Sequence, residues 1–121
     1  MRKFSILLGL LLHLSLATAN AADKAWYGFR LKVDTAGFVL NPTVRSAVIQ
    51  KVAPDSPATA NKIEVGDEII EAEGKKVPGG RALQLKPFLS KKAGDTLRLR
   101  LKRPDGEIYS VIVTGIKKPS A

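Results

Sequence analysis

The chain reads Thr96-Leu97-Arg98-Leu99-Arg100-Leu101-Lys102 near its end, and Pro104-Asp105-Gly106 then leads into the apolar stretch 108–114. Residues 96–102 alternate strictly between polar and apolar side chains, which is the period of a strand with one buried face. The Pro-Asp-Gly sequence supplies turn chemistry between the two stretches. These residues predict a closing β-hairpin whose arginines face water.

Upstream of the hairpin, short strand-like stretches are separated by turn signals. We expect strands over residues 28–33, 47–52 and 68–72, because each has apolar positions bounded by Gly, Pro or Asp. The segment 34–42 is rich in turn formers, but Phe38-Val39-Leu40 inside it predicts a short strand or a packed loop.

Two stretches read as short helices. Ser56-Pro57-Ala58 predicts a helix start, since Ser can cap free amides and Pro suits the first helical position. Residues 81–92 predict a second helix that Pro87 complicates, so the helix either begins near Gln84 or kinks there. Its apolar stripe, at i, i+3 and i+4, consists of Leu85, Phe88 and Leu89.

The start of the chain reads as a targeting segment. Arg2 and Lys3 are followed by an apolar run over residues 4–17, and Ala19-Asn20-Ala21 has the small-x-small pattern of a cleavage site. An uncleaved membrane anchor is the alternative, but the run is shorter than the ~20 residues of a span. We therefore expect an exported, periplasmic or extracellular protein with no transmembrane segment after cleavage.

The chain has 121 residues, enough for one domain. We divide it into a signal peptide over 1–21, a folded domain over 22–116 and a flexible tail over 117–121. The pattern predicts an α+β domain, in which a small, partly open antiparallel β-barrel or sandwich is capped by two short helices.

Residue composition excludes several kinds of chemistry. The chain has no cysteine, and its single histidine, His13, lies in the expected signal peptide. A Ser-His-Asp triad, a Cys-His pair and zinc sites built on His or Cys are therefore excluded from the mature chain. We expect no cofactor, no metal and no enzymatic activity.

The charge balance is strongly basic. The formal net charge is +9, and loss of Arg2 and Lys3 would leave +7. A basic surface favours anionic partners, although export argues against nucleic acid. Arg98, Arg100 and Lys102 fall on one face of a strand and with Arg103 would form a cationic strip. This strip is either an ordinary wet face or a docking surface for acidic proteins or lipid head groups.

Four segments, in this order along the chain, resemble the PDZ domains of secreted bacterial proteases. They are Trp26-Tyr27-Gly28-Phe29, which resembles the carboxylate-binding loop, and the segments 52–58, 65–70 and 93–106. The resemblance covers residues 25–114. The chain departs from the family pattern at Glu73-Gly74, where Asn-Gly is frequent, and at Asn61-Lys62-Ile63, where Ala-Gly-Leu is frequent.

The resemblance implies a function as well as a fold. A protein C-terminus or extended peptide would add as a strand to the edge at residues 29–33, facing the helix over residues 85–89, and the loop amides would hold a terminal carboxylate. The peptide-binding residues that the resemblance implies are Trp26, Tyr27, Gly28, Phe29, Arg30, Leu31, Leu85 and Leu89.

Other functions stay open at this point. A cationic binder of acidic polymers or lipid head groups at the cell envelope would use the basic strip and not the groove. A regulatory subunit of a separate periplasmic protease would use the groove. A protease acting through a Ser-Lys pair such as Ser90-Lys91 is disfavoured, since the mature chain is filled by one domain.

Overall fold

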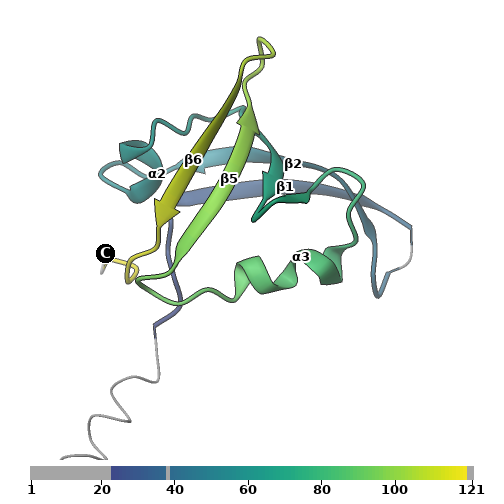
Figure 1. Cartoon of the computed structure of the whole chain (residues 1–121), viewed down its shortest axis with the longest axis horizontal. Coiled ribbons are helices and arrows are strands. Elements are labelled where there is room, and N and C mark those ends of the chain that lie inside the picture. Colours follow the sequence, from purple (N-terminus) through teal and green to yellow (C-terminus); the bar gives the residue numbers. More distant parts are fainter. Residues whose placement is uncertain (1–22, 38, 120–121) are drawn as a thin grey trace, which may run out of the picture.

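The computed structural model describes residues 23–37 and 39–119, so the expected signal peptide and Phe38 lie outside the described residues. Six antiparallel strands form a sheet of order β1-β2-β3-β5-β6, with β4 paired to β3 alone (Figure 1). The elements are β1 (Phe29–Ala36), β2 (Thr43–Val52), α2 (Pro57–Ala60), β3 (Glu68–Ala72), β4 (Lys75–Lys76), α3 (Ala82–Leu89), β5 (Thr96–Lys102) and β6 (Ile108–Thr114). The sheet is partly open, because β1 and β6 lie at its two ends. The predicted α+β class is confirmed.

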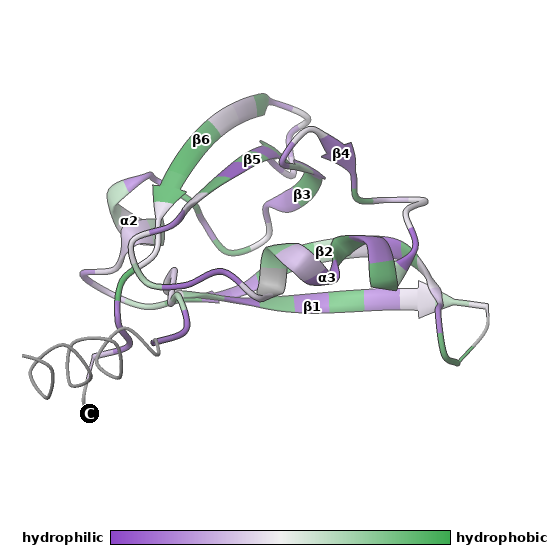
Figure 2. Cartoon of the chain, turned by 60° about the horizontal axis from the view of Figure 1, so that its bottom comes forward, coloured by the Kyte–Doolittle hydropathy of each residue, from purple (hydrophilic) through white to green (hydrophobic). Residues whose placement is uncertain are grey.

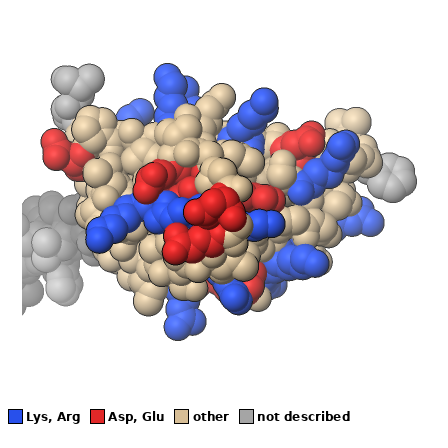
Figure 3. Space-filling view, turned by 90° about the horizontal axis from the view of Figure 1, so that it is seen from above, with Lys and Arg blue, Asp and Glu red and all other residues tan. Residues whose placement is uncertain are grey.

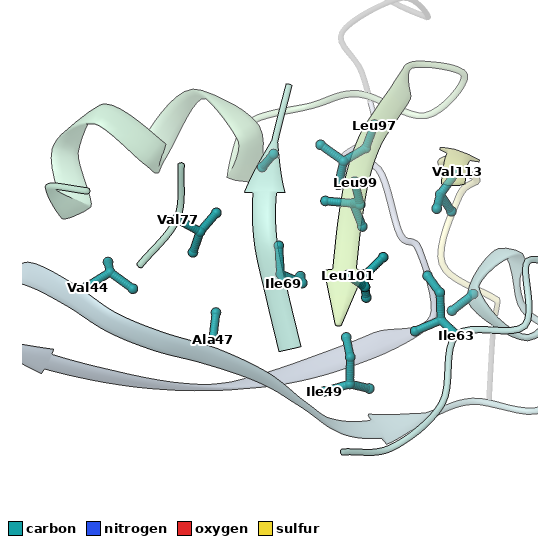
Figure 4. Packing of buried hydrophobic residues seen from close by; sticks show 12 residues of the cluster. Val44, Ala47, Ile49, Ile63, Ile69, Val77, Leu97, Leu99, Leu101 and Val113 are labelled. Atoms are coloured by element: carbon teal, nitrogen blue, oxygen red, sulfur yellow. The ribbon is translucent and has the colours of Figure 1, made fainter. Parts of the chain in front are cut away.

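The closing hairpin forms as predicted. β5 and β6 pair in continuous register from Thr96 opposite Thr114 to Lys102 opposite Ile108. The three leucines of β5 are buried while its polar side chains are exposed. They pack in one core with apolar side chains of β2, β3 and the segment after β4, as Figure 4 shows. The strict alternation of the sequence therefore corresponds to the two faces of β5.

The first helix is held by its cap, as the sequence predicts. The Ser56 hydroxyl accepts a hydrogen bond from the Thr59 N–H (3.2 Å) and donates one to the Ala53 carbonyl (2.7 Å). Pro57 takes the first helical position, and Lys62 follows the helix with a φ of 61°. Lys62 thus adopts the left-handed conformation that the family usually assigns to glycine.

The second helix begins earlier than the first sequence alternative placed it. α3 starts at Ala82, two residues before Gln84, and continues through Pro87. The β1–β2 connection satisfies the first amides: Ala82 N–H donates to the Pro42 carbonyl (2.8 Å), and Leu83 N–H donates to Asn41 Oδ1 (3.1 Å). The start at Ala82 agrees with the predicted helix over residues 81–92, and the alternative start near Gln84 lies two residues too late.

The β1–β2 connection differs from its prediction as well. Val39 and Leu40 are 95% and 89% exposed and lie in a turn, so neither a short strand nor a packed loop forms there. Both strands are longer than expected and reach Ala36 and Thr43. The turn therefore extends into solvent, where no other described part of the domain packs against Val39 and Leu40. Within the described residues, neither helix is long and apolar enough to cross a bilayer.

Candidate functional site

Strand β1 forms one end of the sheet, and its outer edge is free in the described part of the chain. It pairs with β2 alone. The register between the two strands skips Gln50 and Arg45, so both bulges belong to β2. β1 therefore alternates without interruption over eight residues.

The hydrogen bonds at the start of β1 show which of its backbone groups face that edge. Ala53 N–H donates to the Gly28 carbonyl (2.7 Å), which makes Phe29 and Val52 a pair that exchanges no hydrogen bonds. The N–H and C=O of Phe29 consequently point away from β2. The two-residue period of a strand gives Leu31 and Val33 the same orientation.

The same alternate residues line an apolar groove between β1 and α3. The two elements lie alongside one another in Figure 2, and the groove has a volume of about 180 Å³. Core residues of β2, β3 and β5 form its floor. Its walls are Phe29, Leu31, Val33 and Thr35 on β1 and Ala82, Leu85 and Phe88 on α3. Val33 is 49% exposed although it lies in the middle of a strand, because nothing in the described chain covers this stretch of the groove.

The loop before β1 directs its amides outward. The Tyr27 carbonyl accepts from the Ala58 N–H (2.9 Å), and the Gly28 carbonyl accepts from Ala53. A trans peptide points its C=O and the next N–H in opposite directions, so the amides of Gly28 and Phe29 face away from α2 and the end of β2. Successive backbone amides that lack an internal partner and face outward are groups that can accept an anion.

Gly28 is required at this position for two reasons. Its φ is 87°, a conformation that side chains with a Cβ disfavour. A Cβ at Gly28 would also lie 2.1 Å from the Cβ of Ser56, which is buried. The loop therefore packs directly on the cap of α2, and this packing fixes the direction of its amides.

The two aromatic residues of the loop, Trp26 and Tyr27, contact other parts of the domain and not the groove. Half-buried Trp26 exchanges backbone hydrogen bonds with Ile116 (2.8 and 3.0 Å). The Tyr27 ring stacks on Phe29, with centroids 6.1 Å apart, and does not line the groove. Burial, assisted by Asp95 and Glu73, raises the pKa of the Tyr27 hydroxyl above its ordinary value. That hydroxyl is buried without a hydrogen-bond partner among the described residues.

The remaining residues implied by the sequence divide between the two faces. Phe29, Leu31 and Leu85 line the groove, whereas Arg30 lies on the opposite face of β1. Leu89 ends α3, and its side chain lies outside what the structure describes. Val33 lies on the predicted edge over residues 29–33, but it was not predicted to bind peptide, nor were Thr35, Ala82 and Phe88. The alternation of β1 and the apolar stripe of α3 were the signals for Val33 and Phe88.

A profile of the PDZ domain family ("PDZ domain") matches residues 27–114, nearly three quarters of the sequence. The chain belongs to the PDZ domain family. The match begins at the loop before β1 and ends with β6, so it includes the whole groove. A search among curated proteins found no match.

Several solved structures share the fold. The photosystem II D1 C-terminal processing protease aligns with a TM-score of 0.62 and 19% identity, over 88% of this chain and 26% of its own. The PDZ domain of a carboxy-terminal protease from Vibrio cholerae, in complex with peptide, aligns with a TM-score of 0.58 and 19% identity, over 82% of this chain and 98% of its own. The HtrA-type protease AlgW with decapeptide aligns with a TM-score of 0.57 and 17% identity, over 81% of this chain and 30% of its own. The chain thus spans about a quarter to a third of the two longer proteases.

A buried ion pair lies at the other end of the domain. Asp67 is 1% exposed, accepts from Arg103 Nη1 (3.0 Å) and the Glu64 N–H (3.1 Å), and is hydrogen-bonded by the Tyr109 hydroxyl. Burial and Asp67 raise the pKa of Tyr109 well above its ordinary value. Arg103 also pairs with Glu64 and Glu107 and lies over the Tyr109 ring. These contacts join the segment before β3 to the closing hairpin.

This cluster corrects the predicted cationic strip. Arg103 turns into an acidic environment and does not extend the row formed by Arg98, Arg100 and Lys102. Arg100 is itself paired with Glu71 (Arg100 Nη1 to Glu71 Oε2, 3.3 Å). Viewed from the side of the β5–β6 turn, acidic and basic side chains intermingle (Figure 3). No cluster suited to a metal ion occurs within residues 23–37 and 39–119.

Proposed function

We propose that this chain is an exported peptide-binding module that takes a protein C-terminus, or another extended segment, as an additional strand on β1. It performs no chemistry of its own in this proposal. One observation carries the proposal: the residues that direct backbone groups to the free edge of β1, Phe29, Leu31 and Val33, also line the apolar groove. A guest strand would meet both features at once.

The two features contribute different parts of the binding. Backbone pairing along β1 gives affinity with little dependence on sequence, while apolar side chains of the guest enter the groove at every second position. Each apolar side chain moved from water into the groove contributes about 1.5–3 kcal/mol if it is fully buried. The amides of Gly28 and Phe29 lie at the start of β1, where the terminal carboxylate of an antiparallel guest would arrive.

Two of the similar structures support this choice, because one is a PDZ domain in complex with peptide and the other a protease with decapeptide. Proteases recur among the similar structures, and a regulatory role toward a separate protease is the second candidate. We infer that the ligands are chain ends or unfolded segments of other exported proteins.

The test compares peptides with free and amidated C-termini on matched variants. Leu31→Asp places a charge in the groove, whereas Ile112→Asp places the same charge on exposed β6, where Ile112 is 57% accessible. A fluorescence-polarisation titration of apolar C-terminal peptides should show at least tenfold weaker binding for L31D and unchanged binding for I112D, since a buried unpaired charge is costly.

Thermal unfolding of both variants checks that they remain folded. Unchanged affinity in folded L31D would refute the groove. Equal affinity for free-acid and amidated peptides would remove the role of the Gly28 and Phe29 amides and leave strand addition in place.

A further inference from the structure

The face of β1 opposite the groove is basic where the strand begins. Arg30 lies directly across from Lys51 on β2. Together with Lys118 and Trp26 they line a shallow hollow of about 260 Å³, to which Gly28 and Phe29 also contribute. Its lining contains three cations and no acidic side chain. The hollow is therefore a concentrated positive site at the carboxylate end of the free edge.

The charge in this hollow is not compensated by the described part of the chain. Like charges directly opposite one another on neighbouring strands are destabilising. No ion pair joins Arg30, Lys32 or Lys51 to an acidic side chain of the described residues. Farther along β1 the situation changes, because Asp34 pairs with Arg45 (Oδ2 to Nε, 3.5 Å). The positive field thus covers the first half of β1 and ends near Asp34.

We propose that this basic face selects guest peptides with acidic side chains at the positions next to the C-terminus that point away from the groove. The inference rests on the proposed function, because it needs a guest strand on β1. Side chains of an added strand alternate, so those between the groove-facing positions lie on the same face as Arg30 and Lys32.

The distances suit such a contact. An added strand lies about 4.8 Å from β1, and long side chains reach both directly opposite and diagonal neighbours on that face. Arg30 and Lys32 would meet the acidic groups directly. Lys51 is one strand farther away and Lys118 lies on the tail, and both add to the positive field of the hollow, which salt screens over ~10 Å at 0.1 M. The recognised peptide then alternates apolar and acidic residues at its end.

Three free-acid peptides separate this inference from the groove itself. All keep valine at the groove-facing positions and end in Asp-Val-Asp-Val, Ser-Val-Ser-Val or Lys-Val-Lys-Val. In low salt we expect the acidic peptide to bind roughly three- to tenfold tighter than the serine peptide, and the lysine peptide to bind more weakly than both, as two exposed charge pairs allow. At about 0.5 M salt the three affinities should converge.

Two charge-reversal variants complete the design. Arg30→Glu should abolish or invert the order of the three peptides. Lys102→Glu makes the same change on an exposed position of β5 and should leave the order intact.

The outcomes are distinguishable. Equal affinity for all three peptides would overturn the inference while the groove function stands. Binding of none of them would remove the proposed function together with the inference. A preference for the acidic peptide that R30E leaves unchanged would also overturn it. Chemical-shift changes at Arg30 and Lys51 on adding inorganic phosphate, without any discrimination among the peptides, would show a free-anion site and contradict it.

Discussion

Replacement of Gly28 by alanine is the sharpest test of how the loop is held, because two separate costs meet at this residue. The first is conformational: a φ of 87° costs a residue with a Cβ about 1–2 kcal/mol. The second is steric, since the new Cβ would lie 2.1 Å from Ser56 Cβ and 2.4 Å from Ser56 Oγ. Forcing a methyl group into packed surroundings costs typically about 1–3 kcal/mol. G28A should therefore destabilise the domain by about 3 kcal/mol.

Gly74 offers a matched control. Its φ is 78°, and a Cβ there would meet no atom within 4 Å. G74A should consequently show the conformational cost alone, about 1–2 kcal/mol. Urea unfolding followed by the fluorescence of the single tryptophan, Trp26, gives both free energies of unfolding. The excess of G28A over G74A measures the contact with the cap of α2.

A second substitution isolates that contact. Ser56→Gly removes both atoms that the new Cβ would meet, at a cost of about 1 kcal/mol for the lost cap and hydrogen bond. In that background Gly28→Ala should cost no more than G74A, which corresponds to a coupling of about 2 kcal/mol between the two sites. Equal destabilisation by G28A and G74A, or strict additivity with S56G, would refute the packing argument for the loop.

Three further predictions concern the rest of the fold. Lys62→Gly should raise the free energy of unfolding by about 1 kcal/mol, because Lys62 adopts a φ of 61°; an unchanged urea midpoint would contradict this. The hydrogen bond from Lys91 lowers the pKa of Glu73, so the pair stabilises the protein at pH values above the ordinary glutamate pKa, and this stabilisation is lost as pH falls. In Lys91→Met, the free energy of unfolding should therefore decrease less between about pH 5 and pH 3 than in the unmodified protein. The pKa of Tyr109 is raised, so stability holds below about pH 10 and falls above it. Asp67→Asn should shift tyrosinate absorbance of Tyr109 to lower pH, and an unshifted titration would argue against the contact.

The sequence was most informative where local patterns coincide with the folded environment. The β5–β6 hairpin was predictable because its period and its turn are encoded within a few residues of each other. The cap at Ser56 was predictable for the same reason. The loop at Gly28 could be assigned through its family resemblance, and the free edge of β1 follows from the strand order of that family.

Features built from distant residues were not predictable. The charged hairpin-turn residue Arg103 could not be assigned to Asp67, since the two are 36 positions apart and each resembles an ordinary surface charge. The cap of α3 comes from Asn41, which lies 42 positions before the amide that it caps. Similarly, the groove wall reaches Thr35 because β2 pairs with β1 beyond the expected end of the strand, and pairing of this kind has no local signature.

A free and largely apolar strand edge invites pairing with a second copy of the same chain, and the charges on β1 bear on why a guest peptide would be preferred. Two copies meeting edge to edge through β1 would bring Arg30 and Lys32 of each close to those of the other, in a protein whose formal charge is already +9. Repulsion of this kind opposes self-association, as lysines commonly do on exposed edges. An acidic guest experiences the opposite sign of the same field. The basic face that opposes pairing with a second copy would then favour binding of an acidic peptide. Reversing the charge with Arg30→Glu should therefore both weaken the binding of acidic peptides and promote dimerisation.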